Sequence, residues 1–275
     1  MVSFKKIKTA PWSAKIGMLM VLITLLAALL APIVAPYDEA EKVGDIWLEP
    51  GGKTILGTDQ LGRDLFTRML YGARNTIAIA LLITFLAFLV GVVTGLMAAT
   101  VGGWLDMIFS RIVDVFMAFP ALILTLMILS ILGTSIPVLI VVIALLDATK
   151  VFRLARALAM DIAVMEFVEV ARLRGEGLGW IISKEVLPNA LPALIAEFGL
   201  RFCFIFLFIS ALSFLGLGIQ PPAADWGSMV RENAGAISFG ILVPLYPAAA
   251  IAFLTVGVNL VVDWFLHISA QIRAQ

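Results

Sequence analysis

The stretch IAIALLITFLAFLVGVVTGLMAATV, residues 77–101, contains no charged side chain. A helix of about 20 apolar residues crosses the hydrocarbon core of a bilayer, which is about 30 Å thick, so this stretch predicts a membrane-spanning helix. The whole chain agrees, because 62% of its 275 residues are hydrophobic and only 14% are charged. A soluble domain has roughly 45–50% apolar and 25% charged residues and could not bury this much apolar surface. The sequence therefore predicts a membrane protein.

Further apolar runs lie on both sides of this stretch. They occur at about 16–36, 112–132, 136–146, 191–215 and 241–266. Together with residues 77–101 they predict six transmembrane helices and hence an all-α polytopic membrane protein. The run at 136–146 is short for a span. It reaches an adequate length only when it is extended to Thr149 and neighbouring helices shelter Asp147.

Basic residues predict the orientation of these helices. Lysines at positions 5, 6, 8 and 15 precede the first apolar run, so the N-terminus is expected in the cytoplasm. Six spans then place the C-terminus in the cytoplasm too. On this topology twelve Lys and Arg side chains lie on the inner side and six on the outer side, which supports the orientation. Pro32 and Pro36 follow the small residues where a signal peptide would be cleaved, so the first helix is expected to be retained.

The polar segment 149–190 is predicted to be a cytoplasmic insertion with helical parts. Its charged side chains recur at helical spacing, and Phe167, Val170 and Ala171 are expected on the opposite face. Glycines at every second position of 175–179 then predict a short helix, a bend and a second short helix. Periodicity alone leaves open whether this segment binds a partner or is an ordinary solvated loop, because solvent-facing helices show the same pattern.

Two strings in this segment resemble the EAA loop of ABC-importer permeases. EVARLRG at 169–175 is followed by VLPN at 186–189. Val170 and Glu185 depart from the general pattern, and the residues at matching positions are Glu169, Ala171, Gly175, Leu187 and Pro188. In that family the loop is the coupling helix, which docks in a groove of the ATP-hydrolysing subunit. The resemblance implies the same role for residues 166–180.

Two further strings narrow the resemblance. LGTDQLGRDLFTRMLYGAR at 56–74 and LSFLGLGIQPP at 212–222 resemble the dipeptide, oligopeptide and nickel permeases, specifically their C-type subunit. The resemblance implies the transmembrane domain of a type I ABC importer in a bacterial inner (cytoplasmic) membrane. Residues 1–76 would form the N-terminal tail, the first helix and an outer loop. Residues 77–275 would form the permease domain, with the coupling loop at 149–190.

The resemblance also implies partners for a chain that is not itself an enzyme. These are a second homologous permease subunit, one or two ATP-binding subunits that hold ATP and Mg, the lipid bilayer, and an extracytoplasmic solute-binding protein. Short peptides are the first expectation for the solute. Nickel chelates, opines or other small polar solutes remain open, because residues 147–150 and 266–275 depart from the family's pattern. A membrane scaffold is a second function class, and the intact bend around Gly175 favours transport over it.

The outer segment 56–74 is predicted to dock the solute-binding protein together with residues 216–232. The charged residues expected to contribute are Asp59, Arg63, Asp64, Arg68 and Arg74. The alternative is that Asp64 and Arg68, four residues apart, only pair with each other along an interfacial helix.

Glu197 and Arg201 lie well inside the apolar run at 191–215, near the middle of the membrane. A charged side chain that faces lipid at that depth costs at least ~2.5–3.5 kcal/mol, so both are expected to face the helix bundle or a wet cavity. Their spacing of four residues allows an ion pair. The sequence leaves two interpretations open, a structural pair or a lining of the translocation path.

Other functions find little support in the sequence. The net charge is zero, so overall charge gives no basis for nucleic-acid binding. GGKT at 51–54 resembles the end of a phosphate-binding loop, but Trp47 stands where the first glycine is required. Cys203 and His267 are the only cysteine and the only histidine, so neither a catalytic set nor a metal site is predicted. No inverted repeat is visible, which weakens a secondary-transporter alternative.

Overall fold

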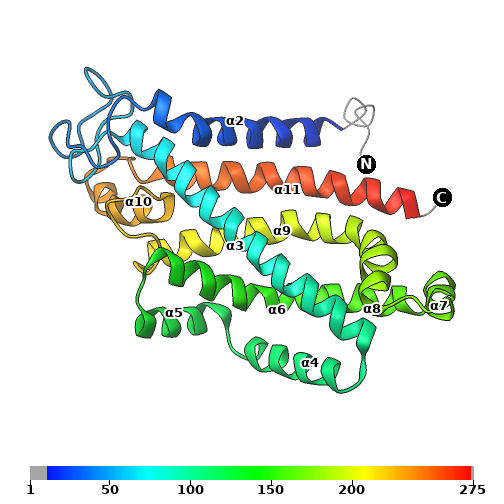
Figure 1. Cartoon of the computed structure of the whole chain (residues 1–275). Coiled ribbons are helices and arrows are strands. Elements are labelled where there is room, and N and C mark those ends of the chain that lie inside the picture. Colours follow the sequence, from blue (N-terminus) through cyan, green and yellow to red (C-terminus); the bar gives the residue numbers. More distant parts are fainter. Residues whose placement is uncertain (1–10, 274–275) are drawn as a thin grey trace.

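In the computed structural model, which describes residues 11–273, the chain forms an elongated bundle of helices (Figure 1). In chain order the elements are α2 (Trp12–Val34), α3 (Leu65–Val101), α4 (Gly103–Met117), α5 (Ala121–Leu132), α6 (Ile136–Ala163), α7 (Glu166–Leu173), α8 (Leu178–Trp180), η1 (Ile181–Val186), α9 (Leu187–Phe214), α10 (Trp226–Glu232), η2 (Ala234–Phe239) and α11 (Leu245–Arg273). Within the described residues, β-structure is limited to isolated bridges in the segment that connects α2 to α3, such as the bridge between Lys42 and Arg63. The prediction of an all-α fold is confirmed.

Four helical segments of the described chain are long and apolar enough to cross a membrane. They are α2, α3, the run from α8 through α9 (Leu178–Phe214) and most of α11 (Leu245–Ile268). A fifth crossing results if α4 and α5 together form one bent span. α6 has the length, but Asp147, Lys150 and Arg153 interrupt its apolar surface. Length and composition therefore do not confirm the predicted number of six.

The predicted span at 112–132 is broken in the structure. α4 ends at Met117, α5 begins at Ala121, and the two helices are bent by 87°. Pro120 stands at the break, where its ring disfavours a helical conformation for Phe119. Proline also lacks a backbone N–H, which does no harm at the start of a helix because the first N–H groups have no partner there. A new helix therefore begins directly after the proline.

Two polar segments are shorter than predicted because helices extend into them. α6 runs on through the first part of the segment 149–190. α3 begins at Leu65 and takes up the last part of the outer loop that was expected to end at residue 76. Asp64 caps this helix, since its Oδ2 accepts a hydrogen bond from the N–H of Thr67 at 2.8 Å. The irregular part of each of these two polar segments is therefore shorter than the sequence predicts.

The contact between α3 and α6 depends on glycine. A Cβ on Gly91 would lie 2.6 Å from the Cβ of Val151, and a Cβ on Gly95 would lie 2.7 Å from the carbonyl oxygen of Phe152. Both distances are too short for a side chain. Small residues four apart let two membrane helices approach closely and pack by van der Waals contact. This contact fixes α6, with its charged residues, against α3.

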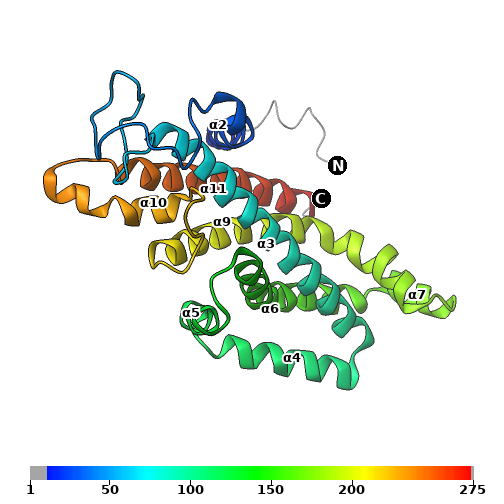
Figure 2. The same ribbon diagram turned by 60° about the vertical axis from the view of Figure 1, so that its left-hand side comes forward.

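The two ends of the bundle carry different structures, which Figure 2 shows from a second side. At one end, the segment between α2 and α3 lies close to α10. At the opposite end, α7 projects beyond the other helices, and the beginning of α2 and the end of α11 lie at this end too. The segments predicted to lie on opposite sides of a membrane therefore lie at opposite ends of the bundle.

Candidate functional site

Four charged side chains form a buried cluster at the end of the bundle where α3 begins. Oδ2 of Asp59 accepts a hydrogen bond from Nε of Arg63 at 2.7 Å and lies 3.3 Å from Nε of Arg68. Oε2 of Glu232, on α10, lies 2.9 Å from Nη2 of Arg63 and 3.5 Å from Nη2 of Arg68. Each of the four side chains is at most 8% exposed. We call these four residues the outer ion cluster.

Hydrogen bonds from backbone N–H groups hold the segment that carries this cluster in place. Oδ1 of Asp59 accepts hydrogen bonds from the N–H groups of Leu61 at 2.8 Å and Arg63 at 3.0 Å, so the carboxylate shapes the turn as well as pairing with arginine. Asn233, at the end of α10, accepts a hydrogen bond at Oδ1 from the N–H of Gln60 at 3.0 Å. These two residues are 173 positions apart in the sequence. The segment before α3 is therefore tied to α10 by side chains of both signs and by an amide.

The structure corrects the expectation that these charges face a solute-binding protein. Four of the predicted docking residues are only 0–5% exposed: Asp59, Arg63, Asp64 and Arg68. Asp64 caps α3 while Arg68 joins the outer ion cluster, so within the described residues the alternative pair of Asp64 with Arg68 is not formed either. Of the five predicted docking residues, only Arg74 is exposed. Docking at this end of the bundle stays a prediction. Glu232 and Asn233 are partners that sequence reasoning missed.

Four other charged side chains meet halfway along the bundle, between α6 and α9. Nε of Arg201 donates to Oε1 of Glu197 at 2.5 Å, and Nη1 of Arg201 lies 3.8 Å from Oδ1 of Asp147 on α6. The same oxygen accepts a hydrogen bond from Nζ of Lys150 at 2.9 Å. We call these four residues the midplane charge chain. Arg201 lies about 21 Å from the first residue of α9, at 1.5 Å per residue, which is near the middle of that helix.

The predicted pairing of Glu197 with Arg201 is present, and Asp147 and Lys150 join it. Sequence reasoning treated Asp147 only as a charge that needs shelter, because spacing along one helix does not reveal a contact with another. The midplane charge chain is only partly buried. The Lys150 side chain is 38% exposed, that of Arg201 20% and that of Glu197 18%. Oδ2 of Asp147 is buried and has no hydrogen-bond partner among the described residues.

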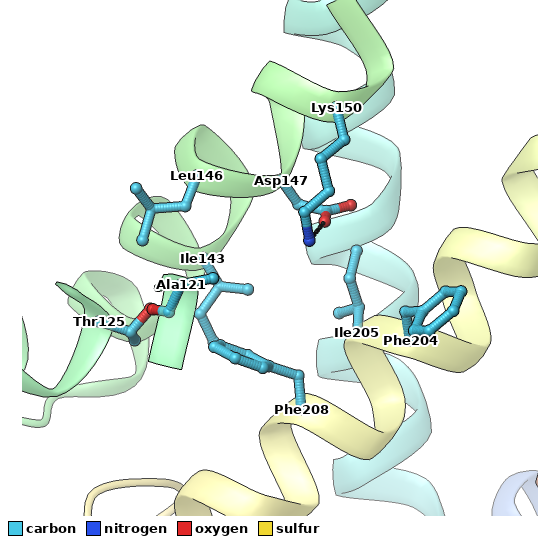
Figure 3. A pocket seen from close by; sticks show the side chains of 9 residues that line it. All are labelled: Ala121, Thr125, Ile143, Leu146, Asp147, Lys150, Phe204, Ile205 and Phe208. Atoms are coloured by element: carbon cyan, nitrogen blue, oxygen red, sulfur yellow. Dashed lines mark hydrogen bonds and ion pairs between the residues drawn. The ribbon is translucent and has the colours of Figure 1, made fainter. Parts of the chain in front are cut away.

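A small cavity of about 90 Å³ lies beside the midplane charge chain (Figure 3). Its charged lining residues are Asp147 and Lys150, and the ammonium of Lys150 reaches toward the Asp147 carboxylate between the side chains of α6 and those of α9. The other lining residues are apolar apart from one threonine: Ala121, Thr125, Ile143, Leu146, Phe204, Ile205 and Phe208. Sites that bind small molecules also have apolar walls with a few placed polar groups, but they usually enclose roughly 300–1,000 Å³, which is more than this cavity offers.

At the far end of the bundle the chain turns sharply after α7. Gly175 has a φ of +81°, and its N–H donates to the carbonyl of Arg172 at 2.9 Å. The N–H of Glu176 donates to the carbonyl of Ala171 at 3.2 Å. These two bonds form a Schellman motif, which ends a helix around one left-handed residue. No described atom lies within 4 Å of a Cβ built on Gly175, so backbone conformation rather than space favours glycine.

The regions that hold the midplane charge chain and this turn have recognisable relatives. Residues 91–272 match the family model described as binding-protein-dependent transport system inner membrane component. The chain belongs to this family. The dipeptide transport system permease protein DppC of Alkalihalophilus pseudofirmus is 33% identical over 95% of this chain and 86% of its own length. The di/tripeptide transport system permease protein DppC of Pseudomonas aeruginosa is 35% identical over 90% of this chain and 84% of its own length. The glutathione transport system permease protein GsiD of Pectobacterium atrosepticum is 31% identical over 89% of this chain and 82% of its own length.

The permease is therefore a multi-pass inner-membrane subunit of a binding-protein-dependent importer. This confirms the family that the strings at 169–175 and 56–74 predict. The matched region begins within α3 and contains the midplane charge chain and the turn at Gly175, whereas three of the four members of the outer ion cluster precede it.

A small apolar core holds the turn of the permease together. Val168 and Ala171 of α7 are fully buried with Ile181 and Val186 of η1, and Leu187 packs against this group. Of the predicted coupling residues, Ala171 and Leu187 therefore lie inside the turn, whereas Glu169, Gly175 and Pro188 are exposed. The apolar side of α7 is not buried as a whole, since Phe167 is 37% and Val170 52% exposed. We call residues 164–180 the elbow.

The segment 216–232 of the permease is another buried connection. Oδ2 of Asp225 accepts the N–H of Ser228 at 2.8 Å and caps α10, while Oδ1 accepts the hydroxyl of Thr76 at 2.8 Å. Burial raises the pKa of Asp225, and these hydrogen bonds oppose the rise. The indole of Trp226 donates to a backbone carbonyl of α3 at 3.0 Å. Much of the segment predicted to dock a partner therefore anchors α10 on α3.

Proposed function

We propose that this permease lines, with a second homologous permease subunit, the path by which an ATP-driven importer moves short peptides or related small polar solutes. The midplane charge chain carries the proposal. Lys150, Arg201 and Glu197 keep exposed side-chain surface near the middle of their helices. A charge that faces lipid at such a depth costs at least ~2.5–3.5 kcal/mol. The face that bears these residues is therefore expected to meet protein or water, as in a path between two subunits.

Short peptides are the solute that fits best. The relatives described above are named as dipeptide, di/tripeptide and glutathione transport system permeases. A short peptide is a zwitterion, and the midplane charge chain presents both signs of charge within one small region. Nickel chelates, opines and other small polar solutes are the alternatives that a solute screen separates from peptides.

We further propose six membrane crossings, formed by α2, α3, the bent pair α4 and α5, α6, α9 and α11. α6 qualifies because Asp147 is only 5% exposed and shares its charge with cationic neighbours. Both chain termini and the elbow would then lie in the cytoplasm, in agreement with the lysines that precede α2. Residues 1–76 would form the tail, first helix and outer loop. Residues 77–275 would form the permease domain with the coupling loop 149–190.

The elbow is proposed to dock on one of the ATP-binding subunits, which hold ATP and Mg. Its surface presents apolar side chains that are 48–84% exposed: Val164, Val170, Leu173 and Leu178. Glu169 is exposed on the same short helix, which adds a negative charge. Exposed apolar surface of this kind marks an interaction site. Gly175 sets the direction in which the chain leaves α7, so a movement of the ATP-binding subunit can reach α9 as a movement of a rigid arm.

The opposite end of the bundle is proposed to dock the solute-binding protein. Since the outer ion cluster is buried, the surface there consists of other residues. Ile55 is 61%, Leu61 52% and Phe239 72% exposed, and Arg74 is exposed as well. The outer ion cluster would support this surface from beneath by holding the segment before α3 against α10.

Reconstitution in proteoliposomes tests the proposed function. The permease, its partner permease, the ATP-binding subunits and the solute-binding protein should import radiolabelled dialanine when ATP is enclosed. Omission of the binding protein, or ADP in place of ATP, should abolish uptake. Dialanine uptake driven by an ion gradient without ATP would contradict an ATP-driven importer. ATP-driven uptake of a nickel chelate or an opine, with none of dialanine, would contradict the peptide assignment alone.

A further inference from the structure

We propose that the ammonium group of Lys150 binds the carboxylate end of a short peptide as it passes through the permease. This inference rests on the proposed function, because it assigns one chemical group of the proposed solute to one side chain of the permease. Lys150 lies about 21 Å along α6, at 1.5 Å per residue, and so near the middle of that helix. Its side chain is the most exposed of the midplane charge chain, at 38%, so a molecule outside the subunit can reach it.

Asp147 holds the Lys150 side chain in place without using all of its donors. Nζ of Lys150 donates to Oδ1 of Asp147 at 2.9 Å, and Figure 3 shows the side chain reaching toward this carboxylate between α6 and α9. An ammonium group has three N–H donors, and this one has Asp147 as its only hydrogen-bond partner in the part of the chain that the structure describes. Two N–H groups are therefore left for an acceptor that comes from outside the subunit.

A carboxylate is the acceptor that suits this position. Hydrogen bonds from an ammonium group to a carboxylate are roughly twice as strong as those between neutral groups. Lys150 lines the cavity of about 90 Å³, which has room for a group of the size of a carboxylate but not for a whole peptide. The rest of the peptide therefore lies outside the cavity. There Phe204, which also lines the cavity and is 60% exposed, offers apolar surface to the atoms next to the carboxylate.

A second cation on α6 also favours an anion at this place. Arg153 lies one turn closer to the elbow than Lys150 and is exposed. Residues three apart on a helix are neighbours on its surface. Among the described residues, the side chain of Arg153 has one hydrogen-bond partner, Sδ of Met117 at 3.6 Å, and a thioether is only a weak acceptor. The midplane charge chain is neutral by itself, so Arg153 makes the exposed side of α6 attractive to a carboxylate on the way to the elbow.

Dialanine and its C-terminal amide test the assignment, because they differ only in the group that Lys150 binds. The complex of both permeases and the ATP-binding subunits in lipid nanodiscs, without the solute-binding protein, is titrated with each probe by saturation-transfer NMR. The unsubstituted complex should bind dialanine about tenfold more tightly than the amide, as expected for one charge-assisted hydrogen bond. Lys150→Met should lose this preference, and Lys150→Arg, which keeps a cationic donor, should retain most of it. Lys15→Met is the matched control, because Lys15 is an exposed lysine on another helix, and it should keep the full preference.

A structural role is the alternative for Lys150, in which its ammonium only neutralises Asp147. Lys150→Met combined with Asp147→Asn separates the two roles, because it removes one cation and one anion together and leaves neither without its partner. If Lys150 only balances charge, this double variant should bind and import dialanine like the unsubstituted protein. If Lys150 binds the solute, the double variant should lack the preference for dialanine over the amide. Where Lys150→Met assembles poorly, the double variant provides the same comparison.

Several results would overturn the assignment: equal binding of the two probes to the unsubstituted complex, no binding of dialanine to it, an unchanged preference in Lys150→Met, or recovery of the preference in the double variant. Uptake in proteoliposomes separates this inference from the proposed function. If Lys150→Met imports dialanine as fast as the unsubstituted transporter, the inference fails and the proposed function stands. If the unsubstituted transporter imports no dialanine, the peptide assignment itself fails.

Discussion

The outer ion cluster and the midplane charge chain contain the same kinds of side chains but differ in how far these side chains are buried. Each combines two anions with two cations, and each joins elements that are distant in the sequence. In the outer ion cluster every side chain is at most 8% exposed. In the midplane charge chain, Lys150 is 38% exposed and Asp147 keeps a buried oxygen without a partner among the described residues. Nε of Arg68, in the outer ion cluster, also has no hydrogen-bond partner among the described residues, so the two networks differ in exposure rather than in hydrogen bonding: one is almost fully buried and the other is partly exposed.

This difference indicates different tasks. A buried charge is stable only when it has a partner of opposite sign, so a network of paired charges that is shielded from water holds one arrangement of the chain. A network with exposed charges can be contacted by a solute or by a second subunit. We therefore expect changes in the outer ion cluster to affect assembly, and changes in the midplane charge chain to affect transport.

The largest effect is expected for Arg68→Met. This removes a guanidinium that lies against both Asp59 and Glu232 and leaves the remaining charges of the outer ion cluster unbalanced. Removing one partner of a buried pair typically costs about 3–5 kcal/mol. Assembled transporter should decrease sharply, and what remains should melt at a temperature roughly 10 °C lower. Fluorescence-detected size-exclusion chromatography with thermal unfolding measures both quantities.

Two controls sharpen this result. Arg74→Met removes the same charge from an exposed position on the same helix and should leave melting unchanged. Arg68→Met together with Glu232→Gln restores neutrality and should recover part of the lost stability. If Arg68→Met melts like the unsubstituted protein, the outer ion cluster is not the structural network described here.

The next effect is expected for Glu197→Gln combined with Arg201→Met. The double change keeps the net charge, so assembly should remain normal, but it removes half of the midplane charge chain. Dialanine uptake per assembled transporter should fall at least about tenfold, or about 1.4 kcal/mol in transition-state terms. Arg63→Met with Glu232→Gln is the matched change in the outer ion cluster and should instead lower the amount of assembled transporter. Normal uptake in the first double variant would show that Glu197 and Arg201 are only structural.

The sequence predicted the parts of this fold that depend on local pattern. Long apolar runs identified the helices because a span is a property of about 20 consecutive residues. The glycines after residue 174 predicted a bend, and the structure shows the left-handed residue at Gly175 that ends α7. The family followed from strings whose spacing is also local. In each case the information lies within a few helical turns of the chain.

Features that depend on distant partners were not predictable in this way. The burial of Asp59 and Arg63 depends on Glu232, which is 169 residues from Arg63 in the sequence. Pairing of Arg201 with Asp147 requires α6 and α9 to pack at one register, which a single helical pattern does not encode. Pro120 was visible, but proline is tolerated in membrane helices, so its presence did not decide between a continuous span and a bend of 87°.

A smaller effect is expected for Gly175→Ala in the elbow. Alanine in a left-handed conformation costs about 1–2 kcal/mol, which should loosen the Schellman motif and change the direction of α7. Uptake should fall several-fold, while the melting temperature should fall by only a few degrees, because neither charge network is touched. Gly177→Ala is the matched control, since Gly177 has a φ of −74° that alanine adopts freely. Uptake and ATP turnover measured together should show ATP hydrolysis that is poorly coupled to transport. Equal uptake by the two variants would contradict a coupling role for Gly175.

The smallest effect is expected for Arg74→Glu, which reverses an exposed charge six residues after the buried Arg68. Since Arg74 is exposed, melting should stay within the small range of ordinary surface changes. If this end docks the solute-binding protein, association should slow by about two- to fivefold, and more at low salt, because rim charges mainly steer encounter. Surface plasmon resonance at two salt concentrations measures the association rate. Arg111→Glu is the control, because it makes the same charge change at an exposed position on α4. Unchanged association at both concentrations would remove Arg74 from the docking surface. A large drop in melting temperature would show that exposed charge at this end is coupled to the outer ion cluster, and the distinction between a buried network and its surroundings would not hold.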